Sequence, residues 1–186
     1  MHSFEPVLPW SVGPGYPHWS DLLRDGTRVL IRPIAKHDAV REAAFIESLS
    51  PRSRRFRFLG QIARPSLDLI TRLTDIDYRH EVAFAAVEAG NPNEAFIGVS
   101  RYSATHDGSS CECAVTVRDD WHHRGLGTLL MKHLIEVARA RGILCMYSFD
   151  TADNAEMEDL ARHLGFTRRI DRKDATLVVH SLWLGS

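Results

Sequence analysis

The sequence predicts an α/β domain in which helices flank one mixed β-sheet. Segments with the alternating pattern of strands and segments with the 3.6-residue period of helices follow one another along the chain. Some strands are joined by short hairpin turns and others by helices, which predicts both antiparallel and parallel neighbours. The 186 residues amount to one domain, and they suffice for a core of ordinary size.

The N-terminal segment, residues 1–23, differs from the rest of the chain and is expected to be extended. It contains four of the eight prolines. Its aromatic residues Trp10, Tyr16 and Trp19 are expected to dock on the body of the domain or on a second subunit, which leaves a homodimer open. The domain itself is expected to span residues 24–186.

Helix ends in the first half of the chain are marked by capping residues and proline. Asp38 lies near the start of a helix expected over 35–49, and Pro51 follows its end. Ser66 is placed to cap a shorter helix over 66–73.

Strands are marked by apolar residues and the turns between them. An Asn-Pro-Asn turn at 91–93 predicts a hairpin between two of the strands. The segment 143–150 is a nearly continuous apolar run, which predicts a strand buried on both faces. In all, strands are expected over 27–34, 81–89, 95–104, 111–117, 143–150 and 176–184, with helices beginning near 35, 66, 124 and 155.

Charge and composition exclude several classes of function. Lys and Arg total 23 against 24 Asp and Glu, so no overall field attracts nucleic acid or an anionic membrane. No apolar run approaches the roughly 18 residues that span a bilayer. The N-terminus also lacks the basic and apolar regions of a secretory signal. We therefore expect a cytoplasmic protein that binds neither nucleic acid nor membrane.

Cysteine and histidine spacing predicts neither a disulfide framework nor a metal site. Cys111, Cys113 and Cys145 are an odd number in a chain without an export signal, and they are expected to be buried free thiols. His122 and His123 are adjacent, so their side chains point apart in an extended loop. Neither has a Cys or carboxylate at ligand spacing, and no metal is expected.

Two glycines, Gly125 and Gly127, lie where a polar loop gives way to a helix expected to begin near Arg124. The first turn of a helix has N–H groups without intrahelical partners and carries partial positive charge. Glycines leave such an end unobstructed for phosphate, and Arg124 adds a full charge. The alternative is that the glycines only allow close packing of the helix. A nucleoside-triphosphate loop and a dinucleotide fingerprint both match poorly, because Thr128-Leu129 and Leu130 stand where those motifs need other residues.

A longer stretch, "VTVRDDWHHRGLGTLLMKHLIEVARARG", resembles the acetyl-coenzyme A motif of the GNAT superfamily of N-acyltransferases. In that family a strand is followed by Gln/Arg-x-x-Gly-x-Gly/Ala, whose amides hold the pyrophosphate of coenzyme A. His122 departs from the Gln/Arg position, which contributes chiefly backbone amides in the family. The later "NAEMEDLARHLGF" resembles the second family signature, with Asn154 at a position that often contacts the coenzyme. Asp153 and Glu156 also form a helix-capping pattern, which is the alternative explanation of that segment.

The resemblance runs from about Arg24 to His180 and is most like the GNAT domain of bacterial protein lysine acetyltransferases. It implies a strongly twisted mixed sheet of about six to seven strands with about four helices, splayed between the strands at 111–118 and 143–149. It implies acetyl-CoA as the donor and no metal. The residues that it implies for coenzyme binding are Val115, Val117, His122, His123, Arg124, Gly125, Leu126, Gly127, Thr128 and Asn154.

The implied reaction is transfer of an acetyl group from acetyl-CoA to a primary amine by direct attack in a ternary complex. A protein lysine is the expected acceptor, with a small amine as the alternative. A non-catalytic module that senses acyl-CoA is a further alternative, because the family's usual tyrosine position on the last helix is Ala161. A backbone N–H around Val115 to Val117 is expected to polarise the thioester oxygen.

Glu112 is the candidate general base, since a glutamate in this strand has that role in the resembled lysine acetyltransferases. Strand alternation places Glu112 on the face opposite Cys111 and Cys113. The alternative is a strand glutamate that simply faces solvent. No general acid is assigned; Tyr147 lies nearby in sequence, but its hydroxyl is expected to satisfy a hydrogen bond in the core.

Two charged segments keep several interpretations. Ser53–Phe58 interleaves three arginines with two phenylalanines. It fits a solvated end of a helix or strand, a nucleic-acid patch, or a contact with the 3′-phosphate of the coenzyme or with an acidic protein substrate. Asp75, Asp77 and Glu81 fit either an acceptor channel that attracts a cationic amine or a solvated loop.

Overall fold

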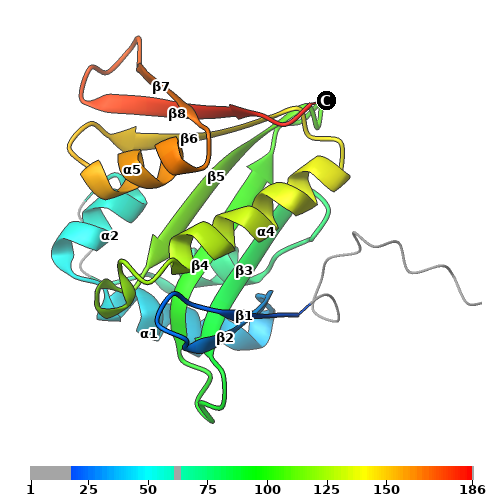
Figure 1. Ribbon diagram of the computed structural model, residues 1–186, viewed down its shortest axis with the longest axis vertical. Coiled ribbons are helices and arrows are strands. Elements are labelled where there is room, and N and C mark those ends of the chain that lie inside the picture. Colours follow the sequence, from blue (N-terminus) through cyan, green and yellow to red (C-terminus); the bar gives the residue numbers. More distant parts are fainter. Residues whose placement is uncertain (1–17, 61–63, 186) are drawn as a thin grey trace, which may run out of the picture.

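Residues 18–60 and 64–185, which the computed structural model describes, form one eight-stranded sheet in the order β1-β2-β3-β4-β5-β6-β8-β7 (Figure 1). The neighbours β5 and β6 run parallel, and all other neighbouring pairs run antiparallel. The mixed α/β sheet predicted from the sequence is therefore confirmed. Its strands are β1 (Trp19–Leu22), β2 (Arg28–Pro33), β3 (Glu81–Glu88), β4 (Phe96–Ala104), β5 (Ser110–Val117), β6 (Cys145–Thr151), β7 (Thr167–Ile170) and β8 (Leu177–Trp183).

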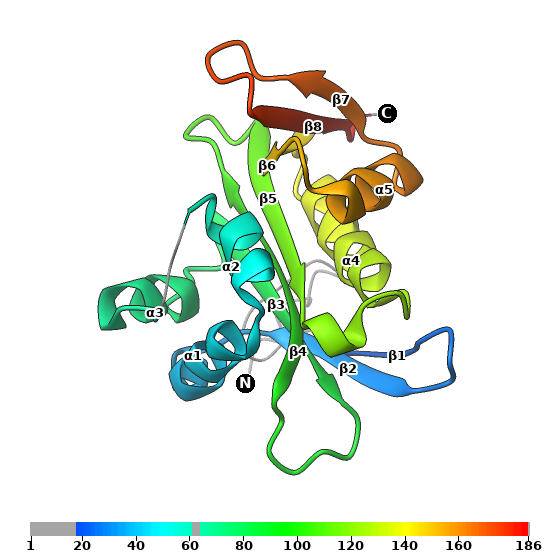
Figure 2. The ribbon, with the colours of Figure 1, turned by 90° about the vertical axis from the view of Figure 1, so that its left-hand side faces the viewer.

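The helices cover both faces of the sheet, with α1 to α3 on one side and α4 and α5 on the other (Figure 2). They are α1 (Ala39–Ser48), α2 (Pro51–Phe58), α3 (Leu67–Thr74), α4 (Leu126–Ala140) and α5 (Ala155–His163), with single 3-10 turns at η1 (Lys36–Asp38) and η2 (Asp119–Trp121).

Two apolar clusters hold these layers together. On one face, Leu126, Leu130 and Leu134 of α4 are fully or almost fully buried, and this helix packs against β3, β4 and β5. On the other face, Phe45 of α1 and Ile70 of α3 pack with small and branched residues of β3 and β4. Each fully buried leucine contributes about 1.5–3 kcal/mol of burial free energy, so α4 is firmly fixed to the sheet.

The strands β5 and β6 separate after a short paired stretch. Only Ser110, Cys111 and Glu112 of β5 have partners in β6, and Glu112 lies opposite Tyr147. Beyond that pair the two strands diverge, as the expected splay requires, and the edge of β5 from Cys113 to Val117 has no strand partner on that side. This opening positions the site described below.

Three elements differ from the expectation. The strands β1 and β7 are edge strands of four residues each, too short to show an alternating pattern. Residues 51–58 form the helix α2, which Ser50 caps by accepting a hydrogen bond from the Ser53 N–H at 3.1 Å. Pro51 thus begins a second helix as well as following the first, since its fixed φ suits the first helical position.

The N-terminal expectation is only partly within the described residues. Trp10 and Tyr16 lie outside them. Trp19 packs on the body of the domain, stacked on His133 with ring centroids 4.3 Å apart and edge-on to Phe84 at 5.0 Å. Because β1 pairs with β2, the sheet begins before the boundary expected at residue 24.

The strand β6 was expected to be buried on both faces, and this prediction is wrong. Met146 and Ser148 are buried, whereas Tyr147 is half-buried and Phe149 is 36% exposed. The helices on the Tyr147 side pack against β4 and β5, so one face of β6 stays partly open. Counting aromatic residues as apolar concealed this alternation.

No helix within the described ranges has the length and apolar character needed to cross a bilayer.

Candidate coenzyme and acceptor site

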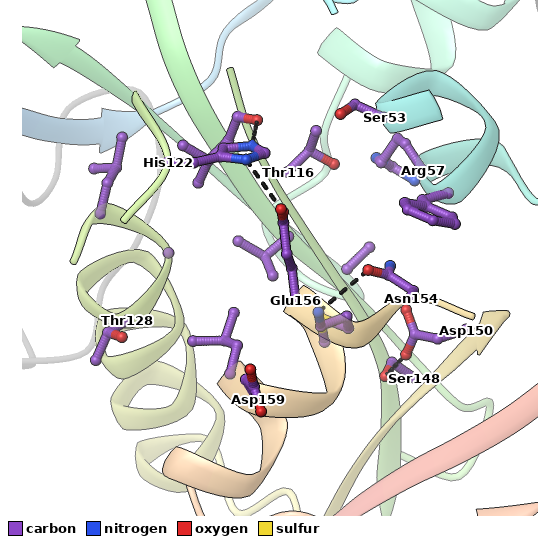
Figure 3. Close-up of a pocket in the computed structure, with 18 of the residues that line it drawn as sticks. Ser53, Arg57, Thr116, His122, Thr128, Ser148, Asp150, Asn154, Glu156 and Asp159 are labelled. Carbon is purple, nitrogen blue, oxygen red and sulfur yellow. Dashed lines mark hydrogen bonds and ion pairs between the residues drawn. The ribbon is translucent and has the colours of Figure 1, made fainter. Parts of the chain in front are cut away.

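A cavity of about 290 Å³ occupies the opening between β5 and β6 (Figure 3). Its walls come from β5 and β6, the loop before α4, the first turns of α4 and α5, and one face of α2. Nine of the ten predicted coenzyme contacts line it: Val115, Val117, His122, His123, Gly125, Leu126, Gly127, Thr128 and Asn154.

The start of α4 presents free backbone donors to this cavity. Gly125 is the N-cap with φ +88° and ψ 2°, a left-handed conformation that favours glycine. This conformation delays the helix to Leu126, slightly beyond the expected start. The first intrahelical bond runs from the Leu129 N–H to the Gly125 carbonyl at 3.1 Å, and no described side chain caps this end. The preceding N–H groups are therefore available to an anion.

Gly127 has a different role from Gly125. A Cβ placed there would lie 3.4 Å from the Leu160 side chain of α5 and 3.7 Å from that of Val117. These are ordinary van der Waals distances, so close packing does not require glycine at position 127, whereas the left-handed backbone conformation favours glycine at position 125.

The cation beside this helix end is Arg24, which the sequence analysis did not single out. Arg24 lies in the turn between β1 and β2, and its N–H donates to the Arg124 carbonyl at 3.1 Å. Its side chain lines the cavity and lies 3.5 Å from a Cβ built on Gly125.

Arg124, the predicted cation, is directed elsewhere. Its guanidinium stacks over Trp121 at 4.7 Å, donates to the Asp120 carbonyl at 3.1 Å and pairs with Asp25 at 3.4 Å. Its side chain does not line the cavity. The helix pattern located the loop correctly but could not show which arginine turns toward it.

The unpaired edge of β5 carries the expected N–H donors. The Arg118 N–H donates to the Ile97 carbonyl of β4, so alternation turns the N–H groups of Val115 and Val117 toward β6. The Val117 carbonyl faces the same way and accepts a hydrogen bond from His122 Nε2 at 2.9 Å.

His122 connects the two sides of the cavity. Besides its bond to β5, its Nδ1 lies 3.1 Å from a carboxylate oxygen of Glu156 in α5 (Figure 3). The departure from the family motif therefore has a structural role, because the imidazole joins β5 to the first turn of α5.

Asn154 is the N-cap of α5. Its side-chain oxygen accepts the Met157 N–H at 3.2 Å, so the capping box expected from Asp153 and Glu156 does not form. Asp153 instead pairs with Arg55 of α2 at 2.7 Å. Asn154 both caps the helix and lines the cavity, which leaves its predicted contact with the coenzyme open.

Glu112 lies beside the cavity rather than in its lining. It is exposed, on the face of β5 that α2 covers, between Ser103 of β4 and Tyr147 of β6. An amine approaching from solvent can therefore reach its carboxylate. The role of Glu112 as a base stays a prediction.

The comparisons with known proteins agree with this geometry. Residues 47–166 match the model of the acetyltransferase (GNAT) family. An acetyltransferase of Pseudomonas aeruginosa is 47% identical over 167 residues, which are 90% of each chain. The chain belongs to the GNAT acetyltransferase family.

Two further proteins are similar to this chain. The GNAT domain of S. lividans PAT is 28% identical with a TM-score of 0.83, over 90% of this chain and 99% of that domain. A Pseudomonas aeruginosa L-methionine sulfoximine/L-methionine sulfone acetyltransferase is 33% identical over 104 residues, or 54% of this chain and 60% of the relative. The family takes its acyl group from acetyl-CoA, and the present chain is an acyltransferase of that kind.

The general acid of this GNAT acetyltransferase remains unassigned. Ala161 is 1% exposed and packs in the core. The hydrogen bond expected for the Tyr147 hydroxyl is absent among the described residues. Burial and the nearby Glu112 carboxylate raise the pKa of Tyr147, so the phenol keeps its proton at neutral pH.

The cysteines are free thiols, as expected, and Cys113 also lines the cavity. Cys111 and Cys113 are buried, whereas Cys145 is half-buried. Burial raises the pKa of Cys111 to about 12 and that of Cys113 well above its usual value. A thiolate nucleophile at neutral pH is therefore disfavoured, which fits direct transfer without a covalent enzyme intermediate.

Sequence reasoning missed two groups of residues in the lining. On β6, Ser148 and Asp150 line the cavity, and no sequence motif predicted them. Asp150 accepts hydrogen bonds from the Ser148 hydroxyl at 2.6 Å and from His180 Nδ1 at 3.0 Å. On α2, Ser53, Phe56 and Arg57 face the cavity. The basic motif at 53–58 was the available signal, but its helical form was not predicted.

The acidic loop after α3 is organised by its own backbone. Asp77 accepts the N–H groups of Arg79, His80 and Glu81 at 2.8, 2.9 and 3.0 Å. Partial burial raises the pKa of Asp77, but these hydrogen bonds lower it by more, so the pKa lies well below its usual value. Its role in the structure is a turn, and it does not line the cavity. Within the described residues, no group of His, Cys, Asp and Glu side chains is placed to hold a metal.

Proposed function

We propose that this acetyltransferase transfers the acetyl group of acetyl-CoA to a lysine side chain of a protein, with Glu112 as general base. The observation that carries the proposal is the position of Glu112, whose side chain is exposed to solvent beside the cavity, at the last paired position of β5 and β6. The resemblance to protein lysine acetyltransferases and the likeness to the GNAT domain of PAT support the protein acceptor.

The coenzyme half of the site fits a nucleotide with a pyrophosphate. The free N–H groups at the start of α4 and the Arg24 side chain would hold its phosphates, and the gap between β5 and β6 would hold its thioester arm. When bound, acetyl-CoA supplies an activated acyl group. The N–H groups of Val115 and Val117 face this gap and can stabilise negative charge that develops on the acyl oxygen.

The amine half requires a base. A lysine amine has a reference pKa of about 10.4, so its deprotonation at pH 7 costs on the order of 4 to 5 kcal/mol. Glu112 accepts one proton from the lysine ammonium, and the neutral nitrogen then bonds to the acyl carbon. As the carbon–sulfur bond breaks, the nitrogen releases its second proton to solvent. The released thiolate takes up a proton from solvent, so the products are an amide and a free thiol.

A small amine is the second candidate acceptor. A relative named for acetylating L-methionine sulfoximine and L-methionine sulfone matches about half of this chain, and this match supports an amino acid as the acceptor. A module that binds acyl-CoA without turnover is a third outcome.

A thiol-release assay with acetyl-CoA separates the three. We expect release with lysine-bearing proteins, accompanied by an acetyl mass shift on lysine. Release with free amino acids or polyamines alone would replace the protein acceptor by a small amine. Coenzyme binding without release for any amine would show a non-catalytic module.

A further inference from the structure

The basic helix α2 places one guanidinium in the cavity. Arg57 lines the cavity on the side opposite α4, over the face of β5 that carries Glu112 and Ala114 (Figure 3). Arg57 therefore lies on the acceptor side of the site, and its charge is close enough to Glu112 for the two groups to interact electrostatically.

The Arg57 guanidinium has no partner that uses its donors. Among the described residues, none forms a hydrogen bond with it or an ion pair within 4 Å, and the guanidinium lies over the Phe58 ring at 5.0 Å. On the same helix, Arg55 pairs with Asp153 at 2.7 Å. A half-buried guanidinium whose five N–H donors have no acceptor lowers the stability of the fold unless a bound anion accepts their hydrogen bonds.

The charged groups around Arg57 do not supply that anion. Glu42 is buried and lies 3.6 Å from Arg101, whose guanidinium also donates to the Leu73 carbonyl at 3.0 Å. Glu112 is exposed to solvent beside the cavity. Burial and the neighbouring Arg101 lower the pKa of Arg57 to about 10, so Arg57 remains charged at neutral pH.

We propose that Arg57 binds a carboxylate carried by the acceptor, so that the enzyme prefers amines with a carboxylate close by. Arg57 and Glu112 then form a pair of opposite charges on one face of β5, complementary to a carboxylate and to an amine of the same substrate. In a protein this carboxylate is an acidic residue beside the target lysine, and in a free amino acid it is the α-carboxylate. The proposal rests on the proposed function, because it names a feature of the same acceptor.

Matched acceptors test the preference and its source. One pair consists of two peptides with a single lysine, flanked by Asp in one and by Asn in the other. The second pair is a free amino acid and its carboxamide. In the wild-type enzyme we expect kcat/KM to be about ten- to a hundredfold higher for the acidic member of at least one pair. The pair that shows this ratio identifies the source of the carboxylate.

Variants of Arg57 test the residue. Arg57→Gln should bring the ratio close to one through a raised KM for the acidic acceptor, with acetyl-CoA affinity unchanged. Arg57→Lys keeps the charge without the planar fork and should retain part of the ratio. Arg52→Gln removes an exposed charge from the same helix and should leave the ratio as in the wild type. Near-ultraviolet circular dichroism confirms that each variant is folded.

Three results would overturn the proposal. Equal kcat/KM for acidic and neutral acceptors in the wild type removes the preference while the acetyltransferase function stands. A loss of acetyl-CoA affinity in Arg57→Gln, with the ratio retained, assigns Arg57 to the coenzyme. If no amine releases thiol from acetyl-CoA, the proposed function itself fails and takes this inference with it.

Discussion

The two halves of the cavity are built in different ways. The coenzyme half consists largely of backbone: the start of α4, the left-handed Gly125 and the unpaired edge of β5. The proposed acceptor half depends on side chains: Arg57 of α2 lines the cavity, and Glu112 of β5 and Tyr147 of β6 lie beside it. Backbone geometry depends on a few glycines and helix signals, whereas the acceptor half depends on how three distant elements pack.

The largest expected effect falls on the acceptor half. Glu112→Gln removes the proposed base, and kcat should fall by about 10²- to 10⁴-fold while acetyl-CoA affinity stays unchanged. Steady-state kinetics and calorimetry of the coenzyme measure the two quantities separately. Glu81→Gln changes a carboxylate two strands away in the same row of the sheet and serves as the control. A Glu112→Gln enzyme with unchanged kcat would remove Glu112 from the mechanism.

On the coenzyme half, Gly125→Val should weaken acetyl-CoA binding by about ten- to a hundredfold. A branched residue at φ +88° costs about 1–3 kcal/mol, and relieving that strain moves the N–H groups. Gly142→Val is the matched control, because Gly142 has φ +77° at the other end of α4, with nothing within 4 Å of its added Cβ. The control should lose stability without losing affinity. Tight coenzyme binding by Gly125→Val would contradict the backbone-built site.

A smaller effect distinguishes the two arginines at this loop. Arg24→Gln should weaken acetyl-CoA binding about tenfold, the value of one charge-assisted hydrogen bond to phosphate. Arg124→Gln should have little effect, since its guanidinium already pairs with Asp25 and stacks on Trp121. Fluorescence or calorimetric titrations of both variants at one ionic strength provide the comparison. A larger loss of affinity in Arg124→Gln than in Arg24→Gln would show that Arg124, the cation expected from the sequence, contacts the coenzyme.

The smallest effect concerns the contact that joins the two halves. Asp119 in η2 accepts the Ser50 N–H at 2.9 Å and the hydroxyls of Ser50 and Ser53 at 2.7 Å each, which ties α2 to the coenzyme loop. Partial burial raises the pKa of Asp119, but these hydrogen bonds lower it by more, so the pKa lies below its usual value. A lowered folded-state pKa adds stability above the unfolded pKa of about 3.9, and this stability is lost as pH falls through the folded value.

Asp119→Asn should therefore lower the free energy of unfolding by about 0.5–1 kcal/mol at pH 6, since solvent screens this exposed group. The difference from the wild type should vanish near pH 2. Urea denaturation at the two pH values measures it. A difference that is the same at both values would show that the carboxylate charge does not act in this contact.

The sequence predicted the coenzyme half far better than the acceptor half. Hydrophobic period and capping residues located α4, the β5 strand and the loop between them, because these signals are local. They could not show that Arg24, about 100 residues away, lines the cavity while the side chain of Arg124 does not. They also missed α2, whose eight residues include four arginines and no apolar stripe, and they predicted burial for the open face of β6. Both errors concern the acceptor side, where the packing of distant elements determines which side chains are exposed.

Calorimetric titration of acetyl-CoA into the purified protein shows whether the backbone N–H groups that follow Gly125 hold the coenzyme. We expect saturable heat with one coenzyme bound per chain, much reduced in Gly125→Val and retained in Glu112→Gln. The absence of any heat of binding with the folded wild-type protein would contradict this expectation.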